Sequence, residues 1–322
     1  MAERWAIIAG NWSATATWNG GTLPAAGDDV YANNFTVTID QNVSVKSLNT
    51  KAGTTAIAGG QFNVPAGAVR TVNADVFGGT TLCLNGLQSN LTFTGNSTGG
   101  SAANAYGVQL SGPGSTQTGN SLGGSFANAN GSQVLSGAVH NGNSVGGSTN
   151  GAFGTNLSGG AFQNGTATGG SALGATGTNC ANGSVFTGNA FGSLTGAALG
   201  CSLTTGSVMV GDSTGGAIVS AGGSNGANGS IIYGRGIGGS SAGAYGIKVD
   251  SSAVAVVTGV TDNVAKGAVI NDRGVYILHN GVQLAQIGFI GSPPYYDGTK
   301  YPFIREASSG VVPKNFNGGF ED

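Results

Sequence analysis

Acidic side chains that could work as a catalytic pair are sparse in the regular part of this chain. Between residues 95 and 257 the only acids are Asp212 and Asp250, and the only bases are Arg235 and Lys248. Hydrolysis of a glycosidic bond needs two carboxyl groups held roughly 5 to 10 Å apart. The two acids fall at different positions of the repeat described below, so we expect them on different sides of the molecule. The sequence therefore predicts no catalytic pair, and we interpret Lys248 and Asp250 as a surface ion pair near Arg235.

Other residues could support metal or acid–base chemistry. Asp28 and Asp29 are adjacent and could help to bind calcium, but no calcium-loop signature surrounds them, so we interpret them as turn residues. His140 and His279 have no acid or nucleophile beside them in the expected arrangement. We therefore predict no metal site and no catalytic residue, and we place both histidines on the surface.

The chain contains three cysteines, Cys83, Cys180 and Cys201. The repeat places Cys180 and Cys201 in adjacent coils and two positions apart, with their Cα atoms roughly 8 Å from each other. This separation is too large for a disulfide, so we predict three buried thiols, as is typical of cytoplasmic synthesis. The glycine clusters lack the following helix and lysine of a phosphate loop, and we predict no bound cofactor.

The composition excludes several protein classes. Only 7% of the 322 residues are charged, the net charge is −2, and 63 residues are glycine. Such a chain offers no basic surface for nucleic acid or for an anionic membrane. No apolar run approaches the ~20 residues that span a bilayer, and the apolar stretch at the start is too short for a signal peptide. A hydrophobic content of 39% is enough for a folded core.

Glycines mark a strict internal repeat. From Gly95 the next equivalent glycine follows after 24 residues, and five further steps are each of 23 residues, giving Gly119, Gly142, Gly165, Gly188, Gly211 and Gly234. Every unit also has glycine four residues after this origin, alanine after ten and glycine after twelve. A coil of about 22 to 25 residues fits one turn of a parallel β-helix, with three short strands separated by bends. The sequence therefore predicts an all-β, single-stranded parallel β-helix.

Alternation within each unit predicts which residues face the core. The clearest inward column, each member preceded by a polar residue, is Leu110, Val134, Leu157, Cys180, Leu203, Gly226 and Val249. A second predicted inward column is Ser115, Val139, Phe162, Val185, Val208, Ile231 and Val254. The third and least regular is Thr98, Leu122, Val145, Thr168, Phe191, Thr214 and Ile237.

Two columns at the bends are candidate functional features. The residues directly after the origins are Asn96, Asn120, Asn143, Thr166, Asn189 and Asp212. Their side chains either form hydrogen bonds from coil to coil or simply tolerate the dihedral angles of a turn. A corner column contains the large residues Tyr106, Phe153, Leu199 and Tyr245. We expect these four to pack against another subunit, and the alternative is that they stack on sugar rings.

Both ends depart from the repeat and are expected to cap it, because an open solenoid exposes strand edges. The predicted division is an N-terminal cap and attachment segment at 1–34, the β-helix at 35–257 (strict from 95), and a C-terminal hairpin with a docking tail at 258–322. The cap contains all three tryptophans, Trp5, Trp12 and Trp18, which we expect to cover the first coil and to take part in docking.

The C-terminal segment combines a hairpin signal with an aromatic tail. Asn280 and Gly281 stand between alternating segments, which is a strong hairpin signal. The tail beyond it carries the predicted docking residues Tyr295, Tyr296, Tyr301 and Phe303. It either caps its own chain or docks on a neighbouring subunit.

The opening segment carries a more specific pattern. It contains Trp12-Ser13-Ala14-Thr15-Ala16-Thr17-Trp18-Asn19-Gly20-Gly21, then Pro24, Gly27-Asp28-Asp29-Val30 and Phe35-Thr36-Val37-Thr38-Ile39-Asp40. In these residues, about the first 50, and loosely in the solenoid, the chain resembles β-helical proteins of bacteriophages and bacterial surfaces. The resemblance implies a tail fibre, a tailspike or a head decoration, usually a homotrimer, with other virion proteins and in some cases a host surface glycan as partners. Depolymerases of this kind use acids in a groove or between subunits, and this chain has no matching pair.

Three hypotheses follow. The first is a non-enzymatic structural protein on the surface of a phage virion, made in the host cytoplasm without a signal peptide. The second is a polysaccharide-degrading spike whose acids, Asp212, Asp250 or Asp262, meet between chains. The third is a bacterial surface adhesin or an ice-binding solenoid, but no column is consistently threonine and no secretion signal is present.

Overall fold

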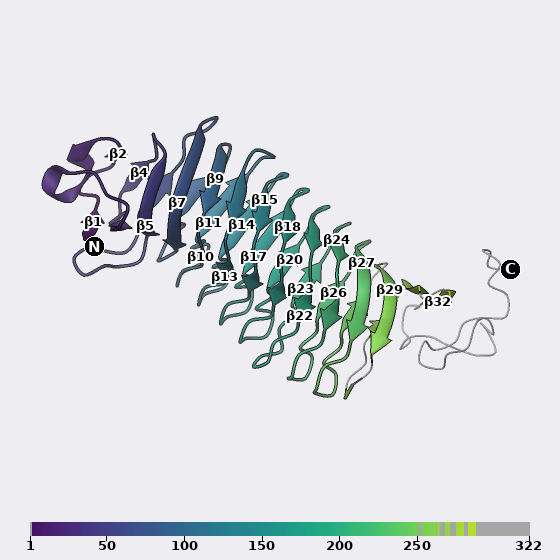
Figure 1. Ribbon diagram of the computed structural model, residues 1–322. Coiled ribbons are helices and arrows are strands. Elements are labelled where there is room, and N and C mark those ends of the chain that lie inside the picture. Colours follow the sequence, from purple (N-terminus) through teal and green to yellow (C-terminus); the bar gives the residue numbers. More distant parts are fainter. Residues whose placement is uncertain are drawn as a thin grey trace.

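The computed structural model describes residues 2–250, 253–261, 263–264, 268–270, 275–279 and 283–287. Figure 1 shows a straight stack of coils with the N-terminal cap at one end. Nearly all strands pair in parallel with the equivalent strand of the next coil, at the ~4.8 Å spacing of a β-sheet, which confirms the predicted parallel β-solenoid with coils of about 23 residues. None of the helices among these residues is long and apolar enough to cross a membrane.

One side of the solenoid is a 12-stranded parallel sheet with one strand from each coil. Its strands are β2 (Gly10–Asn11), β4 (Thr36–Thr38), β6 (Gln61–Asn63), β8 (Leu84–Gly86), β11 (Val108–Ser111), β14 (Ser132–Leu135), β17 (Thr155–Ser158), β20 (Thr178–Cys180), β23 (Cys201–Leu203), β26 (Ser224–Gly226), β28 (Ile247–Val249) and β30 (Ala268–Ile270). The side chains of Leu110, Val134 and Leu157 are buried beneath this sheet. The first predicted inward column is therefore confirmed.

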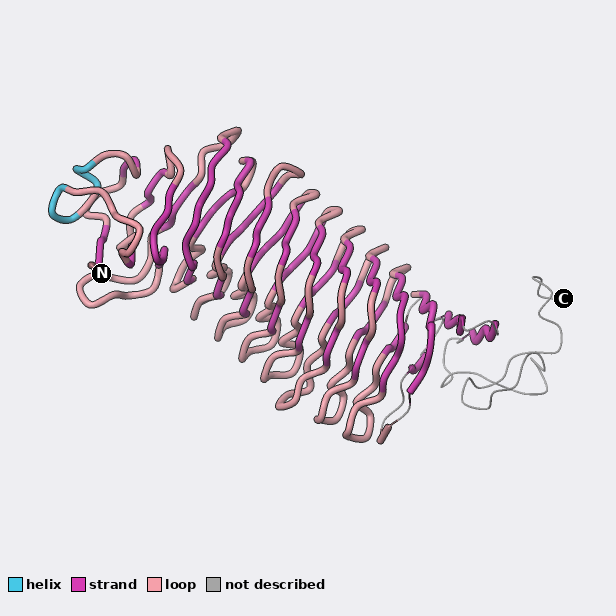
Figure 2. The backbone as a smooth tube through the Cα atoms, in the orientation of Figure 1, coloured by secondary structure: helices cyan, strands magenta, loops and turns pink. Residues whose placement is uncertain are grey.

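The remaining strands belong to a bent 20-stranded sheet that contributes two rows. The first row contains β9 (Asn90–Thr94), β12 (Thr116–Thr118), β15 (Val139–Asn141), β18 (Phe162–Asn164), β21 (Val185–Thr187) and β24 (Val208–Val210). The second row contains β10 (Ser97–Thr98), β13 (Ser121–Leu122), β16 (Ser144–Val145), β19 (Ala167–Thr168), β22 (Ala190–Phe191) and β25 (Ser213–Thr214). Near both ends, long strands span the two rows: β5 (Val43–Asn49), β7 (Val69–Phe77), β27 (Ile231–Ile237) and β29 (Val254–Thr261). Figure 2 shows the long loops that return each coil to the 12-stranded sheet.

The second predicted inward column is wrong by one residue. Phe162 and Ile231 face solvent, and the buried positions of the first row are instead Gln117, His140, Gln163, Phe186, Met209, Ile232 and Ala255. Because side chains alternate along a strand, a shift of one residue exchanges the two faces. Ser115 is buried, but it is not equivalent to Val139, which pairs with Thr116. The extra residue of the 24-residue unit lies before that strand, in the corner between β11 and β12.

The third predicted inward column is also wrong. Leu122, Val145 and Phe191 are exposed, and the inward residues of the second row are Ser97, Ser121, Ser144, Ala167, Ala190, Ser213 and Gly236. Only small side chains fit here, because this row lies close to the opposite sheet: the Ser97 and Ser132 hydroxyl groups are 2.6 Å apart. The larger apolar residues of this row therefore occupy its outer face.

The N-terminal cap is continuous with the solenoid. It contains β1 (Glu3–Trp5), β3 (Asp29–Tyr31) and two short 3-10 helices, η1 (Thr15–Thr17) and η2 (Asn19–Gly21). β1 pairs in parallel with β3, and β3 with β5, so the ladder reaches into the segment predicted as a cap. Trp12 and Trp18 are buried against each other with ring centroids 4.9 Å apart, and Trp12 also lies over Phe62. Trp12 and Trp18 therefore pack over the first coils, whereas Trp5 is a half-buried residue of β1.

At the other end, β31 (Val275–His279) pairs in parallel with β29 and antiparallel with β32 (Gln283–Ile287). This antiparallel pairing matches the predicted hairpin, whose turn at Asn280 and Gly281 lies outside the described residues. The predicted docking residues Tyr295, Tyr296, Tyr301 and Phe303 and the side chain of His279 also lie outside them.

A substitution at a glycine corner tests the stacking. A Cβ atom on Gly99 would lie 2.0 Å from the carbonyl oxygen of Ala129 in the next coil, whereas a Cβ on Gly27 would meet nothing within 4 Å. We expect Gly99→Ala to lower the free energy of unfolding by about 3 kcal/mol or more, because backbone must move. The matched variant Gly27→Ala should lie within about 0.5 kcal/mol of the parent. Thermal and urea unfolding would measure both, and equal midpoints for the two variants would contradict this packing.

Candidate functional site

The two acids of the strict repeat are each paired with a cation. Asp212 accepts hydrogen bonds from Arg235 Nε at 3.0 Å and Nη2 at 2.7 Å, and these bonds hold the pKa of the carboxyl below its ordinary value. Asp250 lies 3.2 Å from Lys248 Nζ. The predicted ion pair of Lys248 and Asp250 is confirmed, and Asp212 and Arg235 form another on a neighbouring face.

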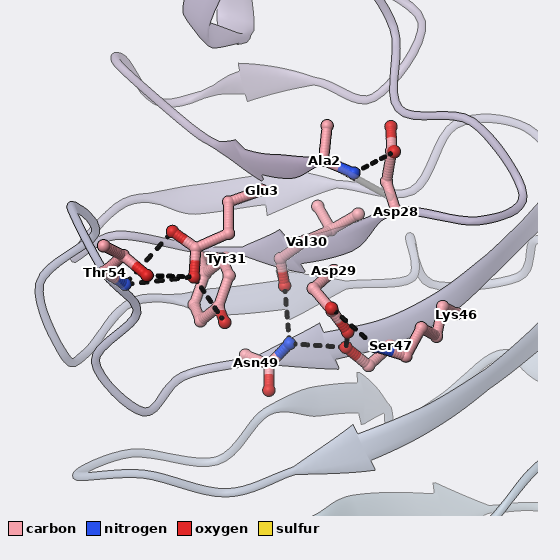
Figure 3. Close-up of polar contacts among 10 residues, drawn as sticks. All are labelled: Ala2, Glu3, Asp28, Asp29, Val30, Tyr31, Lys46, Ser47, Asn49 and Thr54. Atoms are coloured by element: carbon pink, nitrogen blue, oxygen red, sulfur yellow. Dashed lines mark hydrogen bonds and ion pairs between the residues drawn. The ribbon is translucent and has the colours of Figure 1, made fainter.

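The acids of the cap are occupied by hydrogen bonds within the chain (Figure 3). Asp28 accepts hydrogen bonds from the backbone N–H groups of Ala2 at 3.1 Å and Ala25 at 3.0 Å. Burial opposes ionisation of Asp28, but these bonds and the nearby Arg4 outweigh it, so its pKa is lowered. Asp29 binds Lys46 Nζ at 2.7 Å. Within the described residues no group of three or more histidine, cysteine or acidic side chains is placed to hold a metal ion.

A third carboxylate joins the first strand to a distant loop (Figure 3). Glu3 accepts hydrogen bonds from the backbone and the hydroxyl of Thr54, each at 3.0 Å, and from the Tyr31 hydroxyl at 3.3 Å. Burial, followed by the charge of Glu3, raises the pKa of Tyr31 to about 12. These contacts fix the cap to the solenoid, which is a structural role.

The interior contains a polar segment that the sequence interpretation missed. Gln117, His140 and Gln163 occupy successive coils of the first row, are buried, and are flanked by the buried rings of Phe93 and Phe186. Gln117 Nε2 donates to Ser97 Oγ at 3.0 Å, and Gln163 Oε1 accepts from Thr178 Oγ1 at 2.9 Å. Small hydroxyl residues on the other two sides of the coil supply these partners. The sequence did show these polar residues recurring at the repeat period. Because the predicted inward column was one residue out of register, they were assigned to the outer face.

His140 is therefore a core residue, and its predicted surface position is wrong. Its Nε2 lies 2.8 Å from the carbonyl oxygen of Gly119, and its Nδ1 lies 3.2 Å from Thr155 Oγ1. This arrangement suits a neutral ring that donates through Nε2 and accepts through Nδ1. Burial lowers the pKa of His140 to about 4, and the hydrogen bonds to Gly119 and Gln163 oppose this only in part.

The three cysteines are buried free thiols, as predicted. Cys201 pairs with Thr178 and Leu203 with Cys180, so the two thiols are diagonal neighbours in adjacent coils. Burial raises the pKa of Cys83 and of Cys201, so both are held as neutral thiols.

The asparagine column forms a coil-to-coil ladder. The side-chain oxygen of each asparagine in this column accepts a hydrogen bond from the backbone N–H one coil later, as from Asn120 to Asn96 at 3.0 Å and from Asn143 to Asn120 at 3.1 Å. At the C-terminal end Asp212 replaces asparagine and accepts from Arg235. The hydrogen-bonding interpretation of this column is therefore confirmed, and the ladder is structural.

The corner column alternates between large and small residues. Tyr106, Phe153, Leu199 and Tyr245 are half-buried, whereas the intervening Asn130, Thr176 and Gly222 are buried. A Cβ on Gly222 would lie 2.3 Å from the Tyr245 ring and 2.9 Å from Leu199, so the large side chains fill the space above the small one. The large side chains of the corner column thus pack on one another, and the predicted contact of this column with a subunit or a sugar stays a prediction.

A shallow groove of about 690 Å³ follows the corner after the second row. Its floor is the backbone of paired glycines, one wall includes Leu122 and Val145, and the other includes Ser125 and Ser148. Lys51 lies at one end, over the ring of Phe77 at 4.2 Å from its centroid. Lys51 is the one charged residue among the lining residues, so the groove is uncharged except for a positive charge at that end.

The chain matches no family model, no curated protein and no solved structure. The functional interpretation therefore rests on the residues and geometry of this chain.

Lowering the pH should destabilise the protein through His140. Below pH 6.5 the unfolded chain takes up a proton on this histidine, but the folded chain does not do so until about pH 4. The free energy of unfolding should therefore fall between these values by about 3 kcal/mol from this group alone. His140→Gln, which extends the column of Gln117 and Gln163, should remove this component.

Urea unfolding of both proteins at pH 7, 6, 5 and 4 measures the effect. Because all other titrating groups are shared, the difference between the two pH profiles isolates His140. Parallel profiles would contradict the buried, neutral histidine.

Proposed function

We propose that this chain is a non-enzymatic structural protein of a bacteriophage virion, displayed on the particle surface as a tail fibre, a spike-type adhesin or a capsid decoration. The observation that carries the proposal is the uninterrupted parallel ladder, with one strand per coil through the 12-stranded sheet. At the interstrand spacing this stack is a rod about 50 Å long. Its backbone hydrogen bonds run along the axis, which suits a stiff element projecting from a surface.

The virion context is supported by the resemblance of the first 50 residues to phage β-helical proteins. We expect a homotrimer that binds other virion proteins at one end, with no nucleic acid and no membrane insertion. The N-terminal end is the better attachment site, because Ile7 and Ile8 are about half exposed there, with exposed fractions of 47% and 50%, beside the buried tryptophans. Solvent-exposed isoleucines at the tip of a rod suit a contact with another protein.

A polysaccharide-degrading spike is the second candidate. Each acid of the strict repeat is already paired with a cation of the same chain. The pairing with Arg235 lowers the pKa of Asp212, which disfavours it as a general acid, because that role needs a raised pKa. An intersubunit site would have to break one of these pairs. Asp262, the third candidate acid, lies outside the described residues.

Electron microscopy of purified phage particles labelled with an antibody to this chain tests the proposal. Label at the tail supports a fibre or spike, and label spread over the capsid supports a decoration protein. Absence of label on all particles would overturn the virion assignment. Particles incubated with pre-immune antibody are the control.

A cleavage assay on host surface polysaccharide separates the enzymatic alternative. We expect no release of oligosaccharides by the parent chain or by Asp212→Asn and Asp250→Asn. Cleavage by the parent chain that is lost in either variant would favour the degrading spike instead.

A further inference from the structure

The outer face of the first row carries an apolar column whose members are exposed or partly exposed. Consecutive coils place equivalent residues side by side, and the column consists of Thr71, Thr92, Thr116, Val139, Phe162, Val185, Val208, Ile231 and Val254. It is threonine in three coils and apolar in the next six. Phe162 is 47% exposed and Ile231 is 41% exposed, and the four valines of the column are partly exposed.

A second column two residues further along each strand repeats this change later in the rod. Asn141, Asn164 and Thr187 are exposed polar residues, and the next three coils carry Val210, Tyr233 and Val256. Val210 is 40% exposed and Tyr233 is 43% exposed. We call the apolar members of the two columns together the stripe: the six residues from Val139 to Val254 of the first column, and Val210, Tyr233 and Val256 of the second. The stripe therefore widens from one column to two toward the C-terminal end. Contiguous exposed apolar surface of this kind marks an interaction site.

The stripe is electrically neutral. The charged residues beside it are Asp212 and Arg235, which neutralise each other at 2.7 Å. Lys248 and Asp250, the other charged residues between 139 and 256 in the described chain, belong to β28 and the turn after it, on the 12-stranded sheet. A neutral face suits an equally neutral partner, because it offers a basic or acidic partner no compensation for its desolvated charges.

We propose that the stripe binds a second copy of this chain, packed side by side, in parallel and at the same height. The stripe repeats every ~4.8 Å along the axis, so only a surface with the same period can match it over six coils, and a second copy has that period. The widening toward the C-terminal end selects the parallel orientation, because antiparallel packing would set the threonines of one copy against the widest apolar part of the other. A rotation axis parallel to the rod satisfies both conditions. The proposal rests on the expected homotrimer of the proposed function and names its contact face.

The stripe suits this role better than the corner column. Large side chains of the corner column lean over their small neighbours and are half-buried within one chain. On the stripe, in contrast, the side chains of Phe162 and Tyr233 point away from the sheet and remain exposed.

Removal of apolar surface from the stripe tests the proposal. The full chain should sediment as a multiple of the chain mass at high micromolar concentration, and the double variant Phe162→Thr with Ile231→Thr should associate at least tenfold more weakly. Threonine already occupies this column in three coils, so the variant should fold. The control is Phe126→Thr with Leu173→Thr, because these residues are 47% and 67% exposed but lie in the protruding loops. The control should associate as the parent does.

The orientation is measured with spin labels on single cysteines introduced at Asn141, Asn164 or Thr187. The three native cysteines are buried, so labelling is confined to the new site. Parallel packing predicts the same interspin distance at all three positions. In an antiparallel pair the axial offset between the labels would change by about 10 Å for each coil.

A monomeric parent chain, equal weakening by the control, or distances that change along the rod would each overturn the proposal. Because mass and distance are measured on the purified chain, these results are independent of whether the chain is found on a virion. If the purified chain is a monomer but the antibody to it labels phage particles, the proposed function stands and only the stripe contact is ruled out.

Discussion

Each coil of this protein is hydrogen-bonded to the next through its backbone, and most features of the structure follow from the short spacing that these bonds impose. At ~4.8 Å between strands, a corner has no room for a Cβ atom that points along the axis. A Cβ on Gly119, for example, would lie 2.2 Å from the carbonyl oxygen of Gly95, and the backbone of Gly119 has a φ of +140°. The same spacing sets asparagine oxygens within reach of the next coil's N–H groups. Glycine columns and the asparagine ladder are therefore two consequences of one constraint.

The narrow cross-section also reverses the usual distribution of side chains in two of the three rows. Inward positions of the second row hold serine, alanine or glycine, while Leu122 and Phe191 stand outside. In three coils the interior of the first row is polar, with Gln117, His140 and Gln163 each hydrogen-bonded to a hydroxyl group. Buried polar groups are tolerated when each has a partner, and a repeating coil supplies equivalent partners repeatedly.

The repeat, the solenoid and the inward column at Leu110 were predictable from the sequence, because each depends on the period or on residue types with one clear meaning. It was not predictable which of the alternating residues in the first row face the interior. In Val185-Phe186-Thr187 and Val208-Met209-Val210 both faces hold apolar residues, so alternation cannot say which is buried. His140 was predicted on the surface because a polar residue is normally expected there, although its column faces the interior. The ion pair of Lys248 and Asp250 was predictable because the two residues are two positions apart in a segment with few charges, whereas the pair of Asp212 and Arg235 joins two coils and was not predicted.

The 24-residue unit shows where the chain tolerates added length. Four residues, 112–115, join β11 to β12, whereas three, 136–138, make the equivalent connection from β14 to β15, and the strands on both sides keep their register. An insertion is therefore absorbed entirely within this corner, at an exposed Pro113. Foreign peptides grafted at this corner in several coils would be presented as an evenly spaced array, about 5 Å apart per coil, on a scaffold whose ladder is unchanged.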